Sequence, residues 1–232
     1  MSRSAPLAVI TGASRGIGRS TARLLAQRGL RLALLGRRSP ELESARDECL
    51  DRGASEVRLF EADLARLEAV AQAAQRVLVE AGVPDVVVNN AGVAWRTPID
   101  ELSLERWREQ IDVNLGAPYV LTRAFLSSMR ARGHGRIVFV GSISGTLGTP
   151  RQSAYCASKW GLTGFMKSLA EELHDSGMMT CVVAPGSVDT AMLEGSGFEP
   201  RMGPDDVART IVHYALDAPL AHNGAVLEMF GV

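Results

Sequence analysis

Short apolar runs alternate with longer stretches of helical spacing along almost the whole chain. The apolar runs lie at 7–10, 32–35, 57–60, 86–88, 137–140, 181–183 and 225–229. The helical stretches lie at 17–28, 39–52, 65–81, 100–132, 152–175 and 204–217. Apolar strands that alternate with helices are typical of a parallel sheet covered by helices on both faces. The pattern therefore predicts an α/β fold.

We expect the 232 residues to form one domain, 1–232, because no repeat, low-complexity tract or linker interrupts the pattern. The least regular stretch is 191–203, which is rich in glycine, proline and methionine. Loops on a rigid scaffold often bind ligands, so this stretch is a candidate substrate lid.

Composition and charge argue against several classes of function. A net charge of −1 gives no basic bias toward nucleic acid or an anionic membrane surface. No apolar run is long enough to span a bilayer. The four histidines do not cluster and the three cysteines show no metal-ligand spacing, so we expect no metal. Reduced cysteines are typical of a cytoplasmic protein, which is the expected location.

A glycine-rich turn follows the first apolar run, with the sequence Thr11-Gly12-Ala13-Ser14-Arg15-Gly16-Ile17-Gly18. Gly12 permits a tight turn, and Gly16 and Gly18 permit close approach of the backbone to phosphate and to the strand. A helix that begins here offers free N–H groups and a partial positive charge to a dinucleotide pyrophosphate. Ordinary turn chemistry is the alternative, and the position between strand and helix favours the phosphate site.

Tyr155 and Lys159 are four residues apart in a helical stretch, so their side chains share one face. A nearby ammonium favours the phenolate and lowers the pKa of a tyrosine, which then serves as a proton donor and acceptor. The chain has only two lysines, Lys159 and Lys167, against 23 arginines, so a lysine at this place indicates a specific task. An ordinary surface pair is the alternative.

These motifs, in this order and together with several others, resemble the short-chain dehydrogenase/reductase family, in particular its 3-oxoacyl-acyl carrier protein reductases. The other matching positions are Asn89-Asn90-Ala91-Gly92, Asn114, Ser142, Pro185-Gly186 and Thr190. The resemblance implies a doubly wound Rossmann-type sheet of seven parallel strands in the order 3-2-1-4-5-6-7, with ligands at the carboxyl ends of the strands. It also implies hydride transfer between a nicotinamide and a carbonyl or alcohol. The alternative is a catalytically silent dinucleotide-binding sensor or scaffold of the same fold.

The resemblance assigns the catalytic roles to Asn114, Ser142, Tyr155 and Lys159. Tyr155 is the general acid and base, Ser142 donates a hydrogen bond to the substrate oxygen, and Lys159 also binds the nicotinamide ribose. The backbone carbonyl of Asn114 holds a water that relays protons. That carbonyl lacks its ordinary helical partner, because the residue four positions on is Pro118, which has no N–H. We therefore predict a kink or local opening over 114–118; a solvent-facing Asn114 is the alternative.

The residues after the second strand select the dinucleotide in this family. This chain has Gly36-Arg37-Arg38 where an acidic residue would accept hydrogen bonds from the NAD 2′-hydroxyl. Guanidinium groups suit a 2′-phosphate, and Arg15 can face the same place, so NADP(H) is expected, with NAD(H) as the alternative. The competing interpretation is that Arg37 and Arg38 are solvated surface groups.

The resemblance also assigns the remaining cofactor contacts. Asp63 resembles the acid that contacts adenine, with a helix N-cap as its alternative role. Pro185, Gly186 and Thr190 resemble the loop beside the nicotinamide, with a plain turn as the alternative at the first two. The full expected set is Gly12, Ser14, Arg15, Gly16, Ile17, Gly18, Arg37, Arg38, Asp63, Leu64, Asn90, Ala91, Gly92, Tyr155, Lys159, Pro185, Gly186, Val188 and Thr190.

The expected substrate is a small-molecule carbonyl or alcohol. Side chains that follow strand ends or lie in the candidate lid can line its pocket, with ordinary packing as the alternative: Trp95, Ile143, Thr146, Met192, Leu193 and Phe198. The short region after Thr190 weighs against an acyl-carrier-protein substrate. Family members commonly form homodimers or homotetramers through the helices that correspond to 100–132 and 152–175, and the same is expected here.

Overall fold

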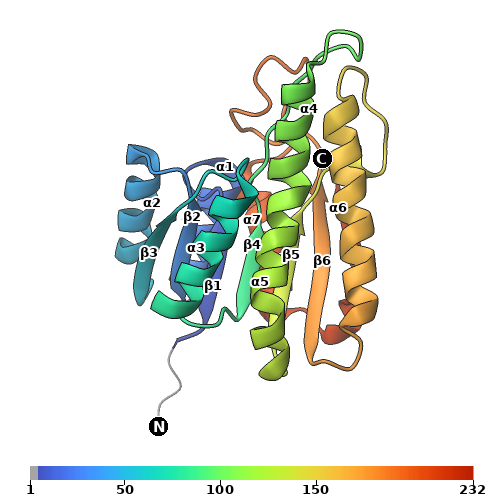
Figure 1. Ribbon diagram of the computed structural model, residues 1–232. Coiled ribbons are helices and arrows are strands. Elements are labelled where there is room, and N and C mark those ends of the chain that lie inside the picture. Colours follow the sequence, from blue (N-terminus) through green and yellow to red (C-terminus); the bar gives the residue numbers. More distant parts are fainter. Residues whose placement is uncertain (1–4, 232) are drawn as a thin grey trace.

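Seven parallel strands form one sheet in the computed structural model of the chain, which describes residues 5–231 (Figure 1). The strands are β1 Leu7–Thr11, β2 Arg31–Gly36, β3 Glu56–Glu61, β4 Val86–Asn89, β5 Gly135–Val140, β6 Met178–Pro185 and β7 Ala225–Met229. Their order, β3-β2-β1-β4-β5-β6-β7, confirms the predicted doubly wound topology. Every predicted apolar run lies within one of these strands.

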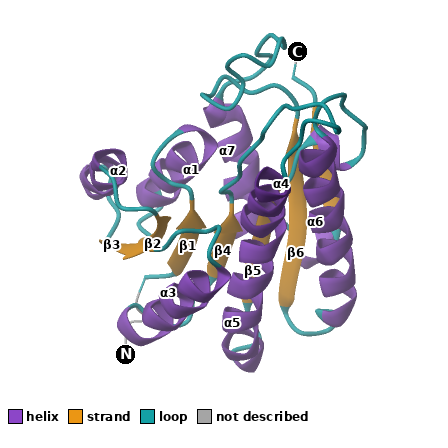
Figure 2. Cartoon of the chain, turned by 45° about the horizontal axis from the view of Figure 1, so that its top comes forward, coloured by secondary structure: helices purple, strands orange, loops and turns teal. Residues whose placement is uncertain are grey.

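Helices cover both faces of the sheet, as Figure 2 shows. They are α1 Gly16–Gln27, α2 Pro40–Asp51, α3 Leu67–Glu80, α4 Leu104–Ile111, α5 Ala117–Ala131, α6 Ser153–Glu172 and α7 Pro204–Val212. One apolar core, with Phe60 and Phe125, lies between the sheet and α3, α5 and α6. A second core, with Ile10 and Leu25, lies between the sheet and α1, α2 and α7. Burial on both faces explains why the strands are apolar throughout.

Four predicted helices differ from the observed ones by two residues or more, and one of them, 152–175, already ends at Glu172. The helix predicted over 65–81 begins at Leu67, because residues 64–65 form a turn. The stretch 100–132 is α4 and α5 joined by a π-helical turn, Asp112–Gly116. The stretch 204–217 ends in a second π-helical turn, His213–Asp217.

The strand order reverses next to β1, which pairs with β2 on one side and β4 on the other. Because all strands are parallel, the loops after β1, β4, β5 and β6 leave the sheet at the same edge, the upper end of Figure 1. The 191–203 segment follows β6 and lies at this edge as well. A switch point of this kind is where open α/β sheets bind ligands.

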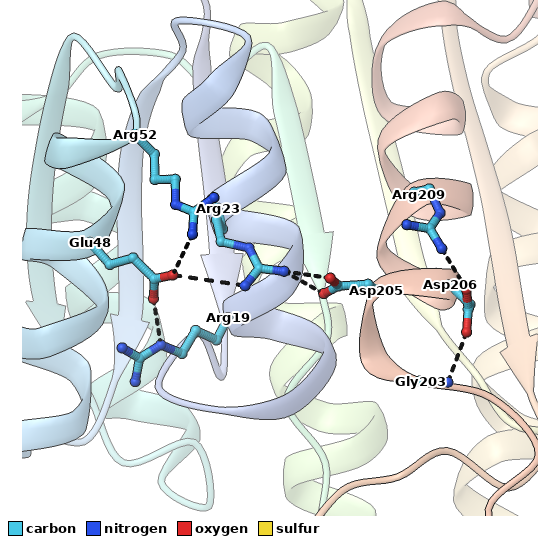
Figure 3. Close-up of polar contacts among 8 residues, drawn as sticks. All are labelled: Arg19, Arg23, Glu48, Arg52, Gly203, Asp205, Asp206 and Arg209. Carbon is cyan, nitrogen blue, oxygen red and sulfur yellow. Dashed lines mark hydrogen bonds and ion pairs between the residues drawn. The ribbon is translucent and has the colours of Figure 1, made fainter.

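Ion pairs connect α1 with its two neighbouring helices (Figure 3). Arg23 of α1 donates to both carboxylate oxygens of Asp205 in α7, each at 2.6 Å. Glu48 of α2 accepts from Arg19 at 2.8 Å and lies 3.8 Å from Arg23. Asp205 lies two residues after the end of the 191–203 segment, so these contacts hold the chain that follows the segment to the helix of the glycine loop. Among residues 5–231, no helix is both long and apolar enough to cross a membrane.

Candidate active site

The glycine loop connects β1 to α1 and requires its glycines. Gly12 and Gly16 have φ of +69° and +54°, which side chains with a Cβ rarely adopt. A Cβ at Gly18 would overlap the Gly12 carbonyl oxygen and Asn90 Nδ2. Two of these glycines therefore serve the turn, and the third permits close packing of α1 on the loop.

The first turn of α1 offers free backbone donors. Arg15 precedes the helix in an extended conformation and its side chain caps nothing. No acidic residue lies in the first turn, so the partial positive charge of this helix end is not neutralised locally. Unsatisfied N–H groups at a helix N-terminus bind phosphate, and Ser14, Gly16 and Ile17 line this end.

Asn90 and Ala91 tie the glycine loop to the end of β4. The Asn90 amide donates to the carbonyl oxygens of Thr11 at 2.9 Å and Gly12 at 3.2 Å. Thr11 Oγ1 accepts from the backbone N–H groups of both Asn90 and Ala91 at 3.0 Å. The Asn90 side chain thus braces the loop, while Gly92 continues toward the catalytic residues.

Arginines gather where β2 ends. Arg37 and Arg38 are exposed, and Arg38 forms an exposed ion pair with Glu43 at 3.0 Å. The pKa of Glu41 lies below its ordinary value because of its own backbone N–H and the Ser39 hydroxyl, with a smaller contribution from the charge of Arg15. The charge of Arg15 therefore reaches the start of α2, which follows Arg37 and Arg38 in the chain.

Asp63 and Leu64 follow β3. Asp63 is exposed, and its Oδ1 accepts from the Ala65 N–H at 3.1 Å. Since α3 begins only at Leu67, Asp63 caps a turn and not the helix, which corrects the N-cap alternative. Leu64 is buried against the core of the α3 side.

Tyr155 and Lys159 lie side by side in α6, and both are buried, with exposed fractions of 8% and 3%. Lys159 Nζ donates to the Val140 carbonyl oxygen at 2.8 Å and lies 5.7 Å from the centre of the Tyr155 ring. A Cβ at Gly92 would lie 3.7 Å from the same Nζ. The surface-pair alternative for Lys159 is therefore wrong.

Burial dominates the protonation of both groups. It lowers the pKa of Lys159 to about 8. It raises the pKa of Tyr155, and a hydrogen bond from Ser142 and the charge of Arg96 oppose this increase. The expected lowering of the Tyr155 pKa is thus not observed, because desolvation of the phenolate outweighs the favourable contacts. Tyr155 is a phenol at neutral pH and holds a proton that it can donate.

Asn114 connects α6 to the segment after β4. Its amide donates to the Val93 carbonyl oxygen at 2.9 Å and to Ser158 Oγ at 3.0 Å, and its Oδ1 accepts from the Val93 N–H at 2.8 Å. Ser158 Oγ in turn donates to the Tyr155 carbonyl oxygen at 2.7 Å. Asn114 is only 1% exposed, so the solvent-facing alternative is wrong.

The helix opens at Asn114, as the position of Pro118 predicts. The π-helical turn spans Asp112–Gly116, and the Ala117 N–H donates to the Asp112 carbonyl oxygen, five residues back. Such turns are rare and often occur at functional sites. The predicted local opening is confirmed.

The chain after β6 returns to the glycine loop. Pro185 is the last residue of β6, and the Gly186 N–H still donates to the Met229 carbonyl oxygen at 2.8 Å, so a plain turn does not begin there. Val188 pairs with Met202 across the 191–203 segment. A Cβ at Gly16 would lie 3.1 Å from Thr190 Cγ2, which places Thr190 against the glycine loop.

The expected pocket residues separate into two groups. A Cβ at Gly92 would lie 3.9 Å from Met192 Cε, and one at Gly186 would lie 3.5 Å from Ile143 Cδ1, so both side chains reach the site. Trp95 and Phe198 are exposed, and Trp95 Nε1 donates to Glu109 at 2.7 Å. The Thr146 hydroxyl lies within hydrogen-bond distance of two acceptors, the Ile143 carbonyl oxygen and the Glu228 carboxylate.

Sequence reasoning missed Ser158 and Arg96. Ser158 lies within the Tyr155–Lys159 turn, where its hydroxyl links Asn114 to α6. Arg96 follows Gly92 by four residues and donates to the Met192 carbonyl oxygen at 2.8 Å. The proximity of Ser158 to the motif was a usable signal, whereas nothing in the sequence pairs Arg96 with a residue so far along the chain.

Comparisons with known proteins agree with this geometry. The family model described as short chain dehydrogenase matches residues 6–199. The 3-oxoacyl-[acyl-carrier-protein] reductase FabG of Escherichia coli strain K12 is 36% identical over 85% of this chain and 79% of its own length.

Two solved structures are similar over nearly the whole chain. A putative NAD(P) dependent gluconate 5-dehydrogenase from Beutenbergia cavernae, with NADP bound at low occupancy, is 36% identical, with a TM-score of 0.91 over 97% of this chain and 95% of that one. A metagenomic short-chain oxidoreductase in complex with NADP is 38% identical, with a TM-score of 0.85 over 98% and 97% of the two chains.

The burial of Lys159 predicts a specific dependence of stability on pH. Between pH 8 and 10.5 the unfolded chain binds more protons than the folded chain, so the free energy of unfolding increases with pH in that window. Relative to Lys159→Met, the wild type should gain about 2–3 kcal/mol between pH 8 and pH 10, measured by urea unfolding.

Lys167→Met is the matched control, because Lys167 is exposed on the same helix. That variant should follow the wild type across the whole pH range. Parallel pH curves for the wild type and Lys159→Met would contradict the burial of a titrating ammonium.

Proposed function

The chain belongs to the short-chain dehydrogenase family, and we propose that it transfers hydride between NADP(H) and a small carbonyl or alcohol substrate. The observation that carries the proposal is the burial of Tyr155 beside Lys159, with the Ser142 hydroxyl close enough to lower the pKa of the phenol. A buried phenol that can exchange a proton, placed next to a dinucleotide site, is suited to this reaction and to little else.

The residues present fit NADP(H). Glycines at three positions leave the loop free of Cβ atoms where the pyrophosphate approaches, and the α1 N-terminus offers unpaired donors. Arg15, Arg37 and Arg38 would bind the 2′-phosphate, to which guanidinium groups are suited. Asp63, Leu64, Asn90, Ala91 and Gly92 would contact the adenosine half of the coenzyme, and Pro185, Gly186, Val188 and Thr190 the nicotinamide half. When bound, the coenzyme supplies or accepts the hydride.

Tyr155 is the proton donor in reduction and the proton acceptor in oxidation. In reduction it gives its phenolic proton to the substrate oxygen as charge develops there. The Ser142 hydroxyl donates a hydrogen bond to the same oxygen, which stabilises that charge. The raised pKa of Tyr155 keeps the phenol protonated before the reaction.

Lys159 and Asn114 complete the site. Lys159 Nζ, which donates to the Val140 carbonyl oxygen, would bind the nicotinamide ribose hydroxyls and stabilise a phenolate at Tyr155. The Asn114 carbonyl, in the π-helical turn, would hold a water that returns a proton toward Lys159. The four residues together favour an enzyme over a silent sensor, which would not need all of them.

Tyr155→Phe should lower kcat by about 10²–10⁴-fold, because the proton donor is lost while the ring remains. The Kd for NADPH, measured from the fluorescence of the reduced nicotinamide, should change by less than about threefold, because the variant loses at most one hydrogen bond to the coenzyme. Tyr214→Phe is the matched control, since Tyr214 has the same exposed fraction of 8% but lies in the other core. If wild type and Tyr155→Phe bind NADPH yet are equally inert toward a broad carbonyl panel, the sensor alternative is favoured.

The arginines after β2 predict a preference for NADPH. The double variant Arg37→Gln/Arg38→Gln should raise KM for NADPH by about 10–100-fold, the cost of losing charged hydrogen bonds to phosphate, and leave KM for NADH nearly unchanged. The control is Arg46→Gln, which removes a partly exposed arginine of α2 that pairs with Asp47, and it should change neither KM. A lower KM for NADH than for NADPH in the wild type would contradict the assignment.

We also propose that two copies of the chain associate through α5 and α6. A groove of about 630 Å³ lies between these helices. The rings of Tyr119 and Phe165 line it, with their centres 6.1 Å apart. Arg123 and Glu172 line the same groove, so a two-fold axis can place the arginine of one copy opposite the glutamate of the other.

The three free cysteines are suited to a reducing, cytoplasmic location.

Tyr119→Arg should therefore shift the protein from dimer or tetramer toward monomer in analytical ultracentrifugation, because it adds a charge to the apolar part of the interface. Val79→Arg is the matched control, since Val79 is 85% exposed on α3, away from the groove. A wild type that is monomeric at high micromolar concentration would contradict the proposed interface.

A further inference from the structure

Arg96 occupies a fixed position beside the catalytic residues. Its backbone neighbours are anchored on both sides: the Trp95 N–H donates to Gln110 Oε1 at 3.0 Å, and the Thr97 N–H donates to the Arg151 carbonyl oxygen at 2.8 Å. Gln110 is completely buried. The segment after β4 is therefore held in place where Arg96 leaves it.

The guanidinium of Arg96 is only partly satisfied. Its Nη2 donates to the Met192 carbonyl oxygen at 2.8 Å. Its Nε is buried and has no hydrogen-bond partner. Within residues 5–231, no carboxylate pairs with it, although many other arginines of this chain form ion pairs. A buried charged donor without a partner is costly, which indicates that an anion completes its contacts.

The surroundings of Arg96 place that anion at the reaction centre. Met192, whose carbonyl oxygen it contacts, reaches Gly92, where a Cβ would lie 3.9 Å from Met192 Cε and 3.7 Å from Lys159 Nζ. The charge of Arg96 also acts on the Tyr155 phenol. The guanidinium thus contacts the 191–203 segment and lies near enough to the phenol for its charge to act on it.

We propose that Arg96 determines specificity by binding a carboxylate of the substrate, so that the enzyme interconverts oxo acids and the corresponding hydroxy acids. The inference rests on the proposed hydride transfer. The Met192 carbonyl oxygen takes only one of the four hydrogens on Nη1 and Nη2, so these two groups can present the fork that a carboxylate fits with two parallel hydrogen bonds. In reduction the carbonyl carbon gains hydride from NADPH, its oxygen gains the Tyr155 proton, Tyr155 regains a proton from solvent, and the carboxylate is unchanged.

The competing role for Arg96 is a purely structural link between the segment after β4 and 191–203. Such a link would affect charged and uncharged substrates alike, since it would position the whole site. A carboxylate contact affects only the acids. The two roles are therefore separated by substrates that differ in charge alone.

The experiment compares short oxo acids with their methyl esters, assayed with NADPH. In the wild type the acids should have the higher kcat/KM. Arg96→Gln should raise KM for the acids by about 10–100-fold, in line with the loss of a charged hydrogen-bond pair, and leave the esters within about threefold. Arg96→Lys should recover part of the loss. Arg106→Gln, which removes a guanidinium stacked on the outer side of Trp95 at 4.7 Å, should behave as the wild type.

A binding measurement keeps the test independent of turnover. Calorimetric titration of the matching hydroxy acids into the protein with NADPH, a pair that cannot react, should give binding in the wild type that Arg96→Gln weakens at least tenfold, consistent with one lost charged contact. If NADPH binds but no carbonyl is reduced, the hydride-transfer proposal fails, and this titration alone decides the role of Arg96.

Three results would overturn the inference. One is an equal loss toward acids and esters in Arg96→Gln, which would indicate the structural link. Another is a wild type that reduces esters and excludes acids, in which case hydride transfer stands and the carboxylate site does not. The third is hydroxy-acid binding that is absent, or unchanged by Arg96→Gln.

Discussion

The site depends on the close contact between α1 and the glycine loop, in which Gly18 packs directly on the Gly12 carbonyl and the Asn90 amide. No side chain fits there, so the helix end, the loop and the end of β4 form one rigid unit. Thr11 extends that unit by accepting from the backbone of Asn90 and Ala91. The next residue, Gly92, lies against Lys159 and Asn114. A single steric constraint thus connects the phosphate end of the site to its proton-transfer end.

Burying the ammonium of Lys159 is the second constraint, and it opposes stability. The group gives up most of its hydration for one hydrogen bond to the Val140 carbonyl oxygen, which is why its pKa decreases to about 8. A position that only needed to pack would hold an apolar side chain at lower cost. The chain uses arginine for almost every other cation, so a compact ammonium here is explained by its reach toward Tyr155 and the ribose and not by packing.

Sequence alone predicted what local chemistry determines. Apolar runs located the strands, because strands buried on both faces must be apolar. Pro118 predicted the opening at Asn114, because a missing N–H has a fixed consequence four residues earlier. The direction of the Tyr155 pKa was predicted wrongly, because it depends on how much of the ring the fold buries. Arg96 was missed because its partner, Met192, is 96 residues away in the sequence.

These differences separate the part of the site that the reaction requires from the part that selects the substrate. Tyr155, Lys159 and Asn114 are held by strands, helices and buried hydrogen bonds, so their geometry follows from the fold. The 191–203 segment lies outside the regular layers and is held near both of its ends. The bridge from Val188 to Met202 closes its base, and the ion pair of Arg23 with Asp205 fixes the helix that follows it. Arg96 holds the start of the segment through the Met192 carbonyl oxygen. A segment anchored at both ends can change the side chains between its anchors without disturbing the sheet, so this chain can acquire its own substrate there while the hydride chemistry stays the same.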